Sequence, residues 1–241
     1  MNNFNLKQFY DQGYSRLGSI VTKSGLKHIS DTVNNIMLGK EKVDFTKLTM
    51  QLDNTVKPTI LKPLKKGFKK STLNYFKIQG LEIHPLFKTL IGFKLFKDIA
   101  EQVYGGIDTK IFRMMMVNKP ENVQVELPWH QNKFIQLDKN PMVTIWIALD
   151  ETTKRRGCMK FIPGSHRYGI LNDQINDDSL TKEQIKTLVD PVKPEYIEMK
   201  AGEVIVFHNS LIHSSGMNTT KQTRRALSIC YMDSSTKVKY K

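Results

Sequence analysis

Two histidines and an amide side chain are the residues whose types and spacing could form a metal site. His130 stands in Trp129-His130-Gln131-Asn132, between two apolar runs, and His213 follows a later apolar run. Non-haem iron sites use two histidines and one carboxylate, which leave positions open on Fe(II) for a cosubstrate and dioxygen. Positions i and i+2 of a strand point to the same side, so the third ligand is expected at residue 132. That residue is Asn132, which offers a neutral carbonyl oxygen in place of a carboxylate.

The rest of the chain predicts helices followed by a mainly β core. Residues 4–12, 24–38 and 84–104 have the apolar spacing of helices, and Gly39 is placed to end the second. From about residue 110, short apolar runs alternate with turn residues, which is typical of a sandwich or barrel. These runs are Ile111–Val117, Met142–Leu149, Met159–Ile162, Ile197–Met199, Val204–Phe207 and Ala226–Met232. We expect one domain over residues 1–241, with a mostly helical part at 1–105 and the β core at 106–235.

Residues 169–200 interrupt this β core. They include a polar stretch at 172–178, after which Ser179 or Thr181 could cap a short helix through Leu188. A connection of this length between two strands is either a lid over a site or a surface insertion. Composition alone does not distinguish these alternatives, and we expect a partial lid.

The composition excludes several classes of protein. The chain has 241 residues, of which 39% are hydrophobic and 25% charged, and this is ordinary globular usage. It therefore excludes a disordered polyelectrolyte, a collagen-like fibre and a disulfide scaffold. No apolar run approaches the roughly 18 residues that span a bilayer, and the N-terminus lacks the apolar stretch of a secretion signal. We expect a cytoplasmic protein without a membrane partner, in which Cys158 and Cys230 are ordinary buried thiols.

The positive charge suggests anionic partners. There are 37 Lys and Arg residues against 23 Asp and Glu, which gives a net charge of +14. Seven lysines and no acidic residue lie between Lys57 and Lys77, in a stretch that prolines and a glycine mark as an extended loop. This loop is either a positive rim beside the site of an anionic substrate or a solvated surface loop. No helix-turn-helix, zinc-finger or RNA-binding pattern accompanies it, so we do not expect nucleic acid as the main partner. No pattern indicates an oligomeric state.

Four motifs, in order, resemble those of the phytanoyl-CoA dioxygenase family. Gly157–His166 reads GCMKFIPGSH and resembles the family signature GCxxxxPGSH. Residues 129–132 resemble the motif of the first iron ligand, and 201–208 the strand that leads to the second. Residues 213–218, with 224–228 after them, resemble the distal ligand and the cosubstrate arginine. The match covers roughly residues 110–232.

This resemblance implies a double-stranded β-helix (a jelly-roll or cupin-like core) and a dioxygenase that uses Fe(II), 2-oxoglutarate and O2. It implies that His130 and His213 are iron ligands, with Asn132 at the third position. Arg224, 11 residues after His213, is then the clamp on the distal carboxylate of 2-oxoglutarate. The resemblance also places Ser215 and Trp146 in the cosubstrate pocket.

Other arginines, histidines and carboxylates near these positions are candidates for the same roles. By strand alternation only one of Arg224 and Arg225 faces inward, and the family spacing favours Arg224. His166 lies in a turn that looks structural, and His208 precedes the second ligand, so we expect neither to bind iron. Of the nearby carboxylates, Asp138 and Glu126 have poor spacing for a ligand on the same face as His130.

Asn132 leaves three alternatives open, because the family has Asp at this position. The first is a working oxygenase that hydroxylates an aliphatic C–H of a small molecule, which we expect to be anionic. The second is a catalytically impaired binding module that keeps the pocket. The third is a halogenase, in which chloride takes the place of the carboxylate, although Asn132 still fills the space that chloride would need.

Overall fold

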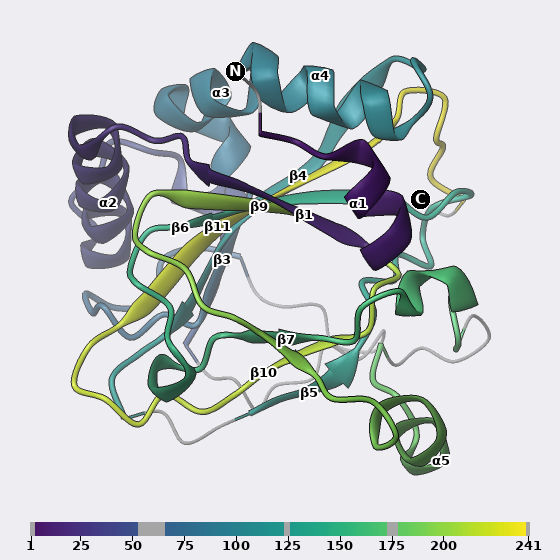
Figure 1. The fold of residues 1–241 in the computed structure, drawn as a ribbon. Coiled ribbons are helices and arrows are strands. Elements are labelled where there is room, and N and C mark those ends of the chain that lie inside the picture. Colours follow the sequence, from purple (N-terminus) through teal and green to yellow (C-terminus); the bar gives the residue numbers. More distant parts are fainter. Residues whose placement is uncertain (1–2, 53–65, 123–125, 173–177, 240–241) are drawn as a thin grey trace.

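The computed structural model describes residues 3–52, 66–122, 126–172 and 178–239. Within these residues the chain forms two antiparallel β-sheets that face each other, with most of the helices on the outer side of the larger sheet and one short helix beside the smaller sheet (Figure 1). The helices are α1 (Leu6–Gln12), α2 (Lys23–Leu38), α3 (Pro85–Ile91), α4 (Lys94–Val103) and the short α5 (Lys182–Gln184). Gly39, in the left-handed conformation, ends α2 as expected.

The larger sheet has seven strands in the order β1-β9-β6-β11-β4-β3-β2. Their bounds are β1 (Tyr14–Ser19), β2 (Thr49–Gln51), β3 (Lys77–Gln79), β4 (Thr109–Lys119), β6 (Val143–Ala148), β9 (Glu203–His208) and β11 (Arg224–Asp233). The smaller sheet has the order β5-β10-β7-β8. Its strands are β5 (Leu127–His130), β7 (Met159–Phe161), β8 (Glu195–Ile197) and β10 (His213–Ser215).

Strand β6 shows how the larger sheet separates two cores. Every residue of β6 is buried, so the strand has no polar face to give to solvent. Ile145 and Ile147 pack with the buried side chains of α2 and α4, on the helical side. Trp146 and Ala148 point the other way and pack with Met159 and other residues of the smaller sheet. The space between the sheets is therefore the inner side of the barrel, where a site could be enclosed.

The structure corrects the expected helix over 84–104. The chain forms α3 and α4 there, separated at Gly92 and Phe93, because Phe93 has an extended backbone and starts the second helix. The apolar spacing continues across the break because both helices pack on the same core. Strands β1, β2 and β3 were not expected from apolar runs, since they are short or carry polar residues.

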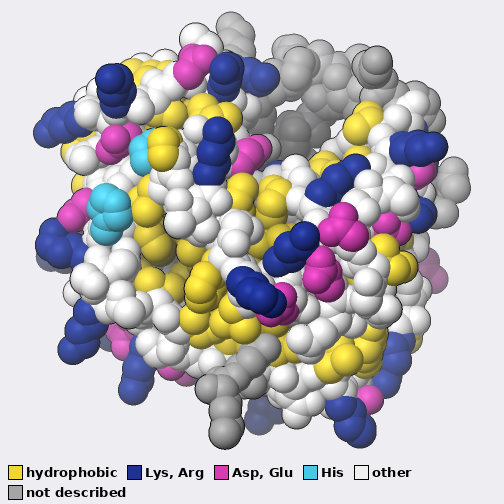
Figure 2. Space-filling model, turned by 90° about the horizontal axis from the view of Figure 1, so that it is seen from above, with side chains coloured by type: hydrophobic (Ala, Val, Ile, Leu, Met, Phe, Trp, Pro, Cys, Tyr) yellow, Lys and Arg dark blue, Asp and Glu magenta, His cyan; other side chains and the backbone are white. Residues whose placement is uncertain are grey.

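The surface bears on the choice of partner. No helix in the described part of the chain is long and apolar enough to cross a membrane. On the face shown in Figure 2, basic side chains are interspersed with acidic and hydrophobic ones and do not form one continuous strip. Among the described residues on that face, the basic side chains therefore do not form the aligned surface that nucleic-acid binding requires.

Candidate active site

The two histidines lie side by side on neighbouring strands of the smaller sheet. His213 in β10 is paired directly with His130 in β5, and the ring centroids are 4.0 Å apart. Each Nδ1 lies 2.8 Å from a backbone carbonyl oxygen two residues earlier, that of Pro128 for His130 and that of Leu211 for His213. An Nδ1–H that donates to these carbonyls puts the ring's lone pair on Nε2, which is the arrangement that orients metal-binding histidines.

The environment of His213 favours the neutral ring that a metal requires. Its side chain is buried, with 5% of the residue exposed. Burial, and secondly the nearby His130, hold the pKa of His213 well below its usual range. The imidazole is therefore uncharged at neutral pH, and only this form binds a metal ion.

The GCxxxxPGSH motif positions His213 through the residue before it. The backbone N–H of Ile162 donates to the carbonyl of Ile212 at 3.0 Å, and the Ser165 hydroxyl accepts from the N–H of Ile212 at 2.9 Å. His166 Nε2 lies 2.9 Å from the backbone carbonyl oxygen of Tyr10, so this nitrogen is engaged by the N-terminal part of the chain. The motif thus fixes the approach to β10, and His166 serves this framework.

A glycine of the same motif permits a close crossing of two chain segments. Gly157 has a φ of 71°, and a Cβ there would collide with the carbonyl oxygen of Gly216. The same Cβ would press on the side chain of Lys119, at 3.0 Å from its Cδ. Only glycine therefore fits between the end of β10 and Lys119.

Asn132 lies in the loop after β5, since the strand ends at His130. The i, i+2 strand argument is therefore not what places its side chain. Its backbone N–H donates to the carbonyl of Asn209 at 2.8 Å, and its Nδ2 donates to Asn209 Oδ1 at 3.1 Å. Asn209 is fully buried and also accepts from the Thr144 hydroxyl at 2.6 Å. With its Nδ2 turned to Asn209, the amide oxygen is the end of Asn132 that could bind a cation.

The donor set around the histidines is neutral. In residues 3–52, 66–122, 126–172 and 178–239, no group of three His, Cys, Asp or Glu side chains could hold a metal ion. Asp138 is exposed and accepts from the N–H of Lys237 at 2.8 Å, and Glu126 is exposed at 3.9 Å from Lys160. Two imidazoles and one amide oxygen fit a divalent metal in donor type but bring no charge to it.

Arg224 faces the space between the sheets and Arg225 faces the helices. Arg224 is 4% exposed, and its guanidinium carbon lies 5.8 Å from the centre of the Trp146 ring. Its buried Nε has no hydrogen-bond partner among the residues that the structure describes. Burial lowers the pKa of Arg224 to about 10, so it stays charged at neutral pH. A buried cation with an unused donor is suited to a carboxylate.

A second buried cation lies opposite Arg224. Lys119 in β4 is paired with Arg224 in β11 and is 1% exposed. Its ammonium donates to the carbonyl of Ser215 at 3.3 Å and to that of Gly216. Burial, and secondly the charge of Arg224, lower the pKa of Lys119 to about 7. Ser215 itself is buried and shares a side of β10 with His213. The sequence motifs did not indicate Lys119.

Within the described residues, the lysine-rich segment reaches the inner side of the barrel at Lys77. Lys77 in β3 is partly buried and lies opposite Val117, while Lys66, Lys69 and Lys70 are exposed. Burial, and secondly the charge of Arg113, lower the pKa of Lys77 to about 8. Lys57, Lys62 and Lys65 lie outside the described residues. Among the described lysines of this segment, Lys77 is the one placed to contribute to a positive rim, and the rim itself stays a prediction.

The 169–200 segment is attached to the strand that carries His130. Ser179 forms a bridge with His130, and the Leu180 N–H donates to the carbonyl of Trp129 at 2.8 Å. The Gln131 N–H donates to the carbonyl of Asp178 at 3.1 Å. Thr181 caps α5, as one of the two expected caps. A lid role for this segment stays a prediction.

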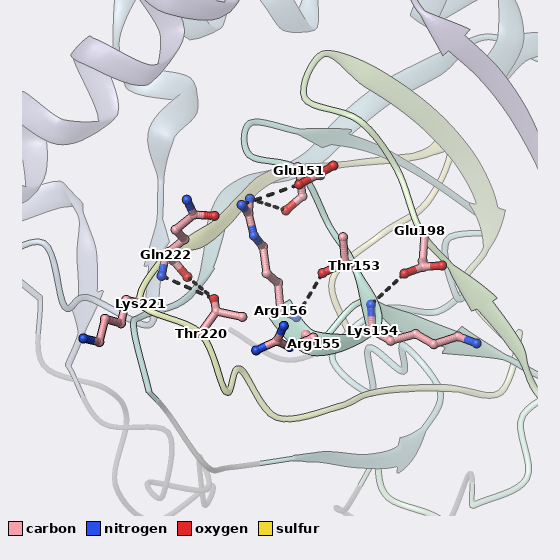
Figure 3. Close-up of a pocket in the computed structure, with 9 residues that line it drawn as sticks. All are labelled: Glu151, Thr153, Lys154, Arg155, Arg156, Glu198, Thr220, Lys221 and Gln222. Carbon is pink, nitrogen blue, oxygen red and sulfur yellow. Dashed lines mark hydrogen bonds and ion pairs between the residues drawn. The ribbon is translucent and has the colours of Figure 1, made fainter.

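A shallow surface hollow of about 560 Å³ is distinct from the paired histidines (Figure 3). It is lined by residues of the loops around Lys154 and Lys221 and by Glu198, and none of the site residues described above lines it. Arg156 points toward Glu151 and lies 3.5 Å from its carboxylate. The hollow's charges are thus partly paired at the surface.

A barrel that holds two histidines on adjoining strands and keeps a buried arginine beside them has the layout of the iron- and 2-oxoglutarate-dependent oxygenases. The chain belongs to the phytanoyl-CoA dioxygenase (PhyH) family, whose sequence profile matches residues 9–226. The predicted family and the predicted fold class are both confirmed.

Individual relatives agree with this assignment. A phytanoyl-CoA dioxygenase of Arabidopsis thaliana is 32% identical over 155 residues, which are 64% of this chain and 54% of that protein. An L-proline trans-4-hydroxylase of Streptomyces griseoviridis is 28% identical over 155 residues, 55% of this chain and 58% of that protein. The chain spans about half the length of the curated relatives it matches.

Solved structures share the fold. The epimerase SnoN, in complex with Fe3+, alpha ketoglutarate and nogalamycin RO, aligns with a TM-score of 0.76 at 16% identity and covers 98% of this chain and 84% of its own. EctD from S. alaskensis, with 2-oxoglutarate and 5-hydroxyectoine, aligns with a TM-score of 0.74 at 19% identity, covering 97% of this chain and 77% of its own. These likenesses support a jelly-roll barrel.

Proposed function

We propose that this chain is an Fe(II)- and 2-oxoglutarate-dependent oxygenase that hydroxylates an aliphatic C–H of a small anionic substrate. The observation that carries the proposal is the pairing of His130 with His213, each with its Nδ1 anchored by a backbone carbonyl. Family membership supports the reaction class. The two neighbouring buried cations, Arg224 and Lys119, support an anionic cosubstrate.

His130, His213 and Asn132 would hold the iron in this proposal. When bound, iron together with 2-oxoglutarate and O2 supplies the oxidising chemistry that an unactivated C–H bond requires. The backbone carbonyls that accept from the Nδ1 atoms keep both imidazoles in one tautomer and orientation. Asn209 orients Asn132 by accepting from both its backbone and its side chain.

The remaining residues position the cosubstrate and exclude water. Arg224 would bind the distal carboxylate of 2-oxoglutarate, because a planar guanidinium can donate two parallel hydrogen bonds to it. Trp146 and Ser215 would line the same pocket, and Lys119 adds positive charge next to Arg224. Phe161 and Phe207 surround His213 with apolar surface, at ring-centroid distances of 6.3 and 5.4 Å. This surface strengthens electrostatic interactions within the site.

The neutral oxygen of Asn132 is the reason for a second candidate, a binding module that keeps the pocket but does not turn over. Loss of one negative ligand charge weakens the attraction for a divalent cation. A chloride-using halogenase is less well supported, because the Asn132 side chain is close to Asp in size and would still fill the space that chloride needs.

The substitution Asn132→Asp separates the first two candidates. We expect the wild-type chain to release succinate when Fe(II), 2-oxoglutarate and O2 are supplied. We expect Asn132→Asp to bind Mn(II), a redox-stable substitute, roughly tenfold more tightly in calorimetry, because it adds one ligand charge. Asn74→Asp, which adds the same charge at an exposed position, is the matched control and should leave both quantities unchanged.

Each other outcome has a distinct meaning. Binding of 2-oxoglutarate without succinate release, in the wild type and in Asn132→Asp alike, would support the binding module. Succinate release only in Asn132→Asp would show an oxygenase scaffold that lacks its charged ligand. A wild-type chain that binds neither 2-oxoglutarate nor Mn(II) would refute the proposed function.

A further inference from the structure

Arg113 is a charged residue in the apolar part of β4, and it does not belong to the pocket around Arg224. It lies in β4 directly opposite Cys230 of β11, whereas Lys119 at the end of β4 lies opposite Arg224. Alternate residues of β4 point to the same side, so Arg113 and Lys119 share the inner side of the larger sheet. Arg224 and Cys230 are six residues apart in a strand, or about 20 Å. The two arginines therefore lie at opposite ends of one surface.

The Arg113 end of this surface is the end at which Asn132 is held. Cys230, opposite Arg113, contacts Asn209 Nδ2 through its Sγ at 3.3 Å. The same Asn209 accepts from the side chain of Asn132 at 3.1 Å. Arg113 is thus connected to the third ligand position through two intervening side chains, on the side away from the Arg224 pocket.

Arg113 has a hydrogen-bonding capacity that the described residues do not use. Its Nε is buried and has no hydrogen-bond partner within the described part of the chain, which also holds no ion pair of this residue. Burial lowers the pKa of Arg113, and the charges of Asp178 and Glu82 only partly oppose this. Glu82 already accepts from the N–H of Met114 at 3.2 Å. A buried, unpaired donor on a permanent cation is costly to leave unused.

Aromatic side chains hold the guanidinium in place. Its central carbon lies 4.5 Å from the ring centre of Phe134 and 5.8 Å from that of Phe112. Phe134 follows Asn132 by two residues in the same loop and is buried. A guanidinium that lies over an aromatic ring keeps its edge available for a bidentate contact with an anion.

We propose that Arg113, oriented by Phe134, is the receptor for an anionic group of the primary substrate, either a carboxylate or a phosphate. Arg224 would then bind the cosubstrate at one end of the barrel, and Arg113 the substrate at the other end. The inference rests on the proposed function for the identity of the bound molecule as a substrate. Anion binding at Arg113 itself does not depend on turnover.

Amphiphiles with matched chain lengths test the proposal directly. The probes are octanoate, octyl phosphate and the uncharged octanamide, titrated calorimetrically into the full chain with Fe(II) and 2-oxoglutarate in the absence of oxygen. We expect the tighter of the two anions to bind about tenfold more strongly than octanamide. Whichever anion binds more tightly identifies the group as carboxylate or phosphate.

The variants isolate the guanidinium. We expect Arg113→Gln to abolish the preference for the anion, and Arg113→Lys to retain part of it. Phe134→Leu keeps the charge but removes the aromatic support, so a partial loss is expected. Arg155→Gln removes an exposed arginine and should change nothing. Unchanged 2-oxoglutarate affinity in Arg113→Gln would show that the variant is folded, and Arg113→Lys serves if it is not.

Equal binding of the anions and octanamide by the wild type would overturn the proposal, as would an undiminished preference in Arg113→Gln. Repeating the titrations without 2-oxoglutarate distinguishes this failure from failure of the proposed function. A chain that prefers the anion through Arg113 but binds no 2-oxoglutarate would refute the oxygenase and leave the Arg113 site standing.

Discussion

Arg224 and Arg225 are consecutive arginines of one strand with opposite surroundings. Arg225 donates to both carboxylate oxygens of Asp150, at 2.7 and 2.9 Å, and to Asn34 of α2 at 2.6 Å. Arg224, on the other side of β11, lies beside a second cation, and its Nε has no partner within the described residues. Arg225 therefore has its hydrogen-bond partners within the fold, whereas Arg224 is available to bind an anionic ligand.

This difference separates stability from binding on two sides of one strand. A cation with satisfied partners fixes the helical layer to the sheet. A buried cation without such partners lowers the stability of the ligand-free protein, and an anion that binds to it offsets this desolvation cost. The two kinds of arginine should therefore respond oppositely to substitution.

Arg224→Met should have the largest effect on binding. We expect the affinity for 2-oxoglutarate to fall about 100-fold, because a charge-assisted bidentate contact is lost. The free energy of unfolding should be unchanged or slightly higher, since a desolvated charge is removed. Calorimetry with 2-oxoglutarate and urea denaturation measure the two quantities. An unaltered 2-oxoglutarate affinity would show that Arg224 is not the clamp.

Arg225→Gln should give the converse result. The free energy of unfolding is expected to fall by about 2 kcal/mol, because Asp150 loses a largely buried ion-pair partner. The affinity for 2-oxoglutarate should stay within about twofold of the wild type. Urea denaturation checks the first expectation. A variant with wild-type stability and weakened 2-oxoglutarate binding would reverse the assignment of the two arginines.

Lys119, the cation beside Arg224, should make the affinity for 2-oxoglutarate depend on pH, and this is the smallest of the expected effects. Its pKa of about 7 means that it is charged below neutral pH and loses its charge as the pH rises through this value. The affinity for 2-oxoglutarate, a dianion, should therefore fall roughly fivefold between pH 6 and 8.5. Bound 2-oxoglutarate favours the charged form of Lys119, so the pKa of Lys119 should be higher in the complex than in the free protein.

Lys119→Met should bind 2-oxoglutarate weakly at all pH values in this range and show no such decline. Lys110→Met is the control, because Lys110 is an exposed lysine at the other end of the same strand. A wild-type affinity that does not change with pH would mean that Lys119 does not act on the cosubstrate.

The sequence predicted the barrel because its motifs are local. The paired-histidine motifs and the GCxxxxPGSH turn each lie within about ten residues, so their spacing survives without knowledge of the fold. Strand β1 escaped prediction because Tyr14–Ser19 has a polar composition and is stabilised by pairing with β9. The break between α3 and α4 escaped because packing on one core preserves the apolar spacing across it.

The candidate site was predicted less completely. Asn209 and Lys119 belong to it through contacts between segments far apart in the chain, which no local pattern reveals. Arg113 did carry a local signal, a single charge inside the apolar run Ile111–Val117. Its meaning depends on the register of β4 against β11, and register comes only with the assembled sheet.

The pairing of residues 178–180 with β5 has a consequence for solubility. Strand β5 is an edge strand of the smaller sheet, and the Trp129 carbonyl and the Gln131 N–H beside it would otherwise offer an open template to another chain. The segment from Asp178 to Leu180 caps that template with its own backbone, in the manner by which natural sheets avoid edge-to-edge association. Shortening this segment to probe substrate entry would therefore also uncover a strand that can aggregate.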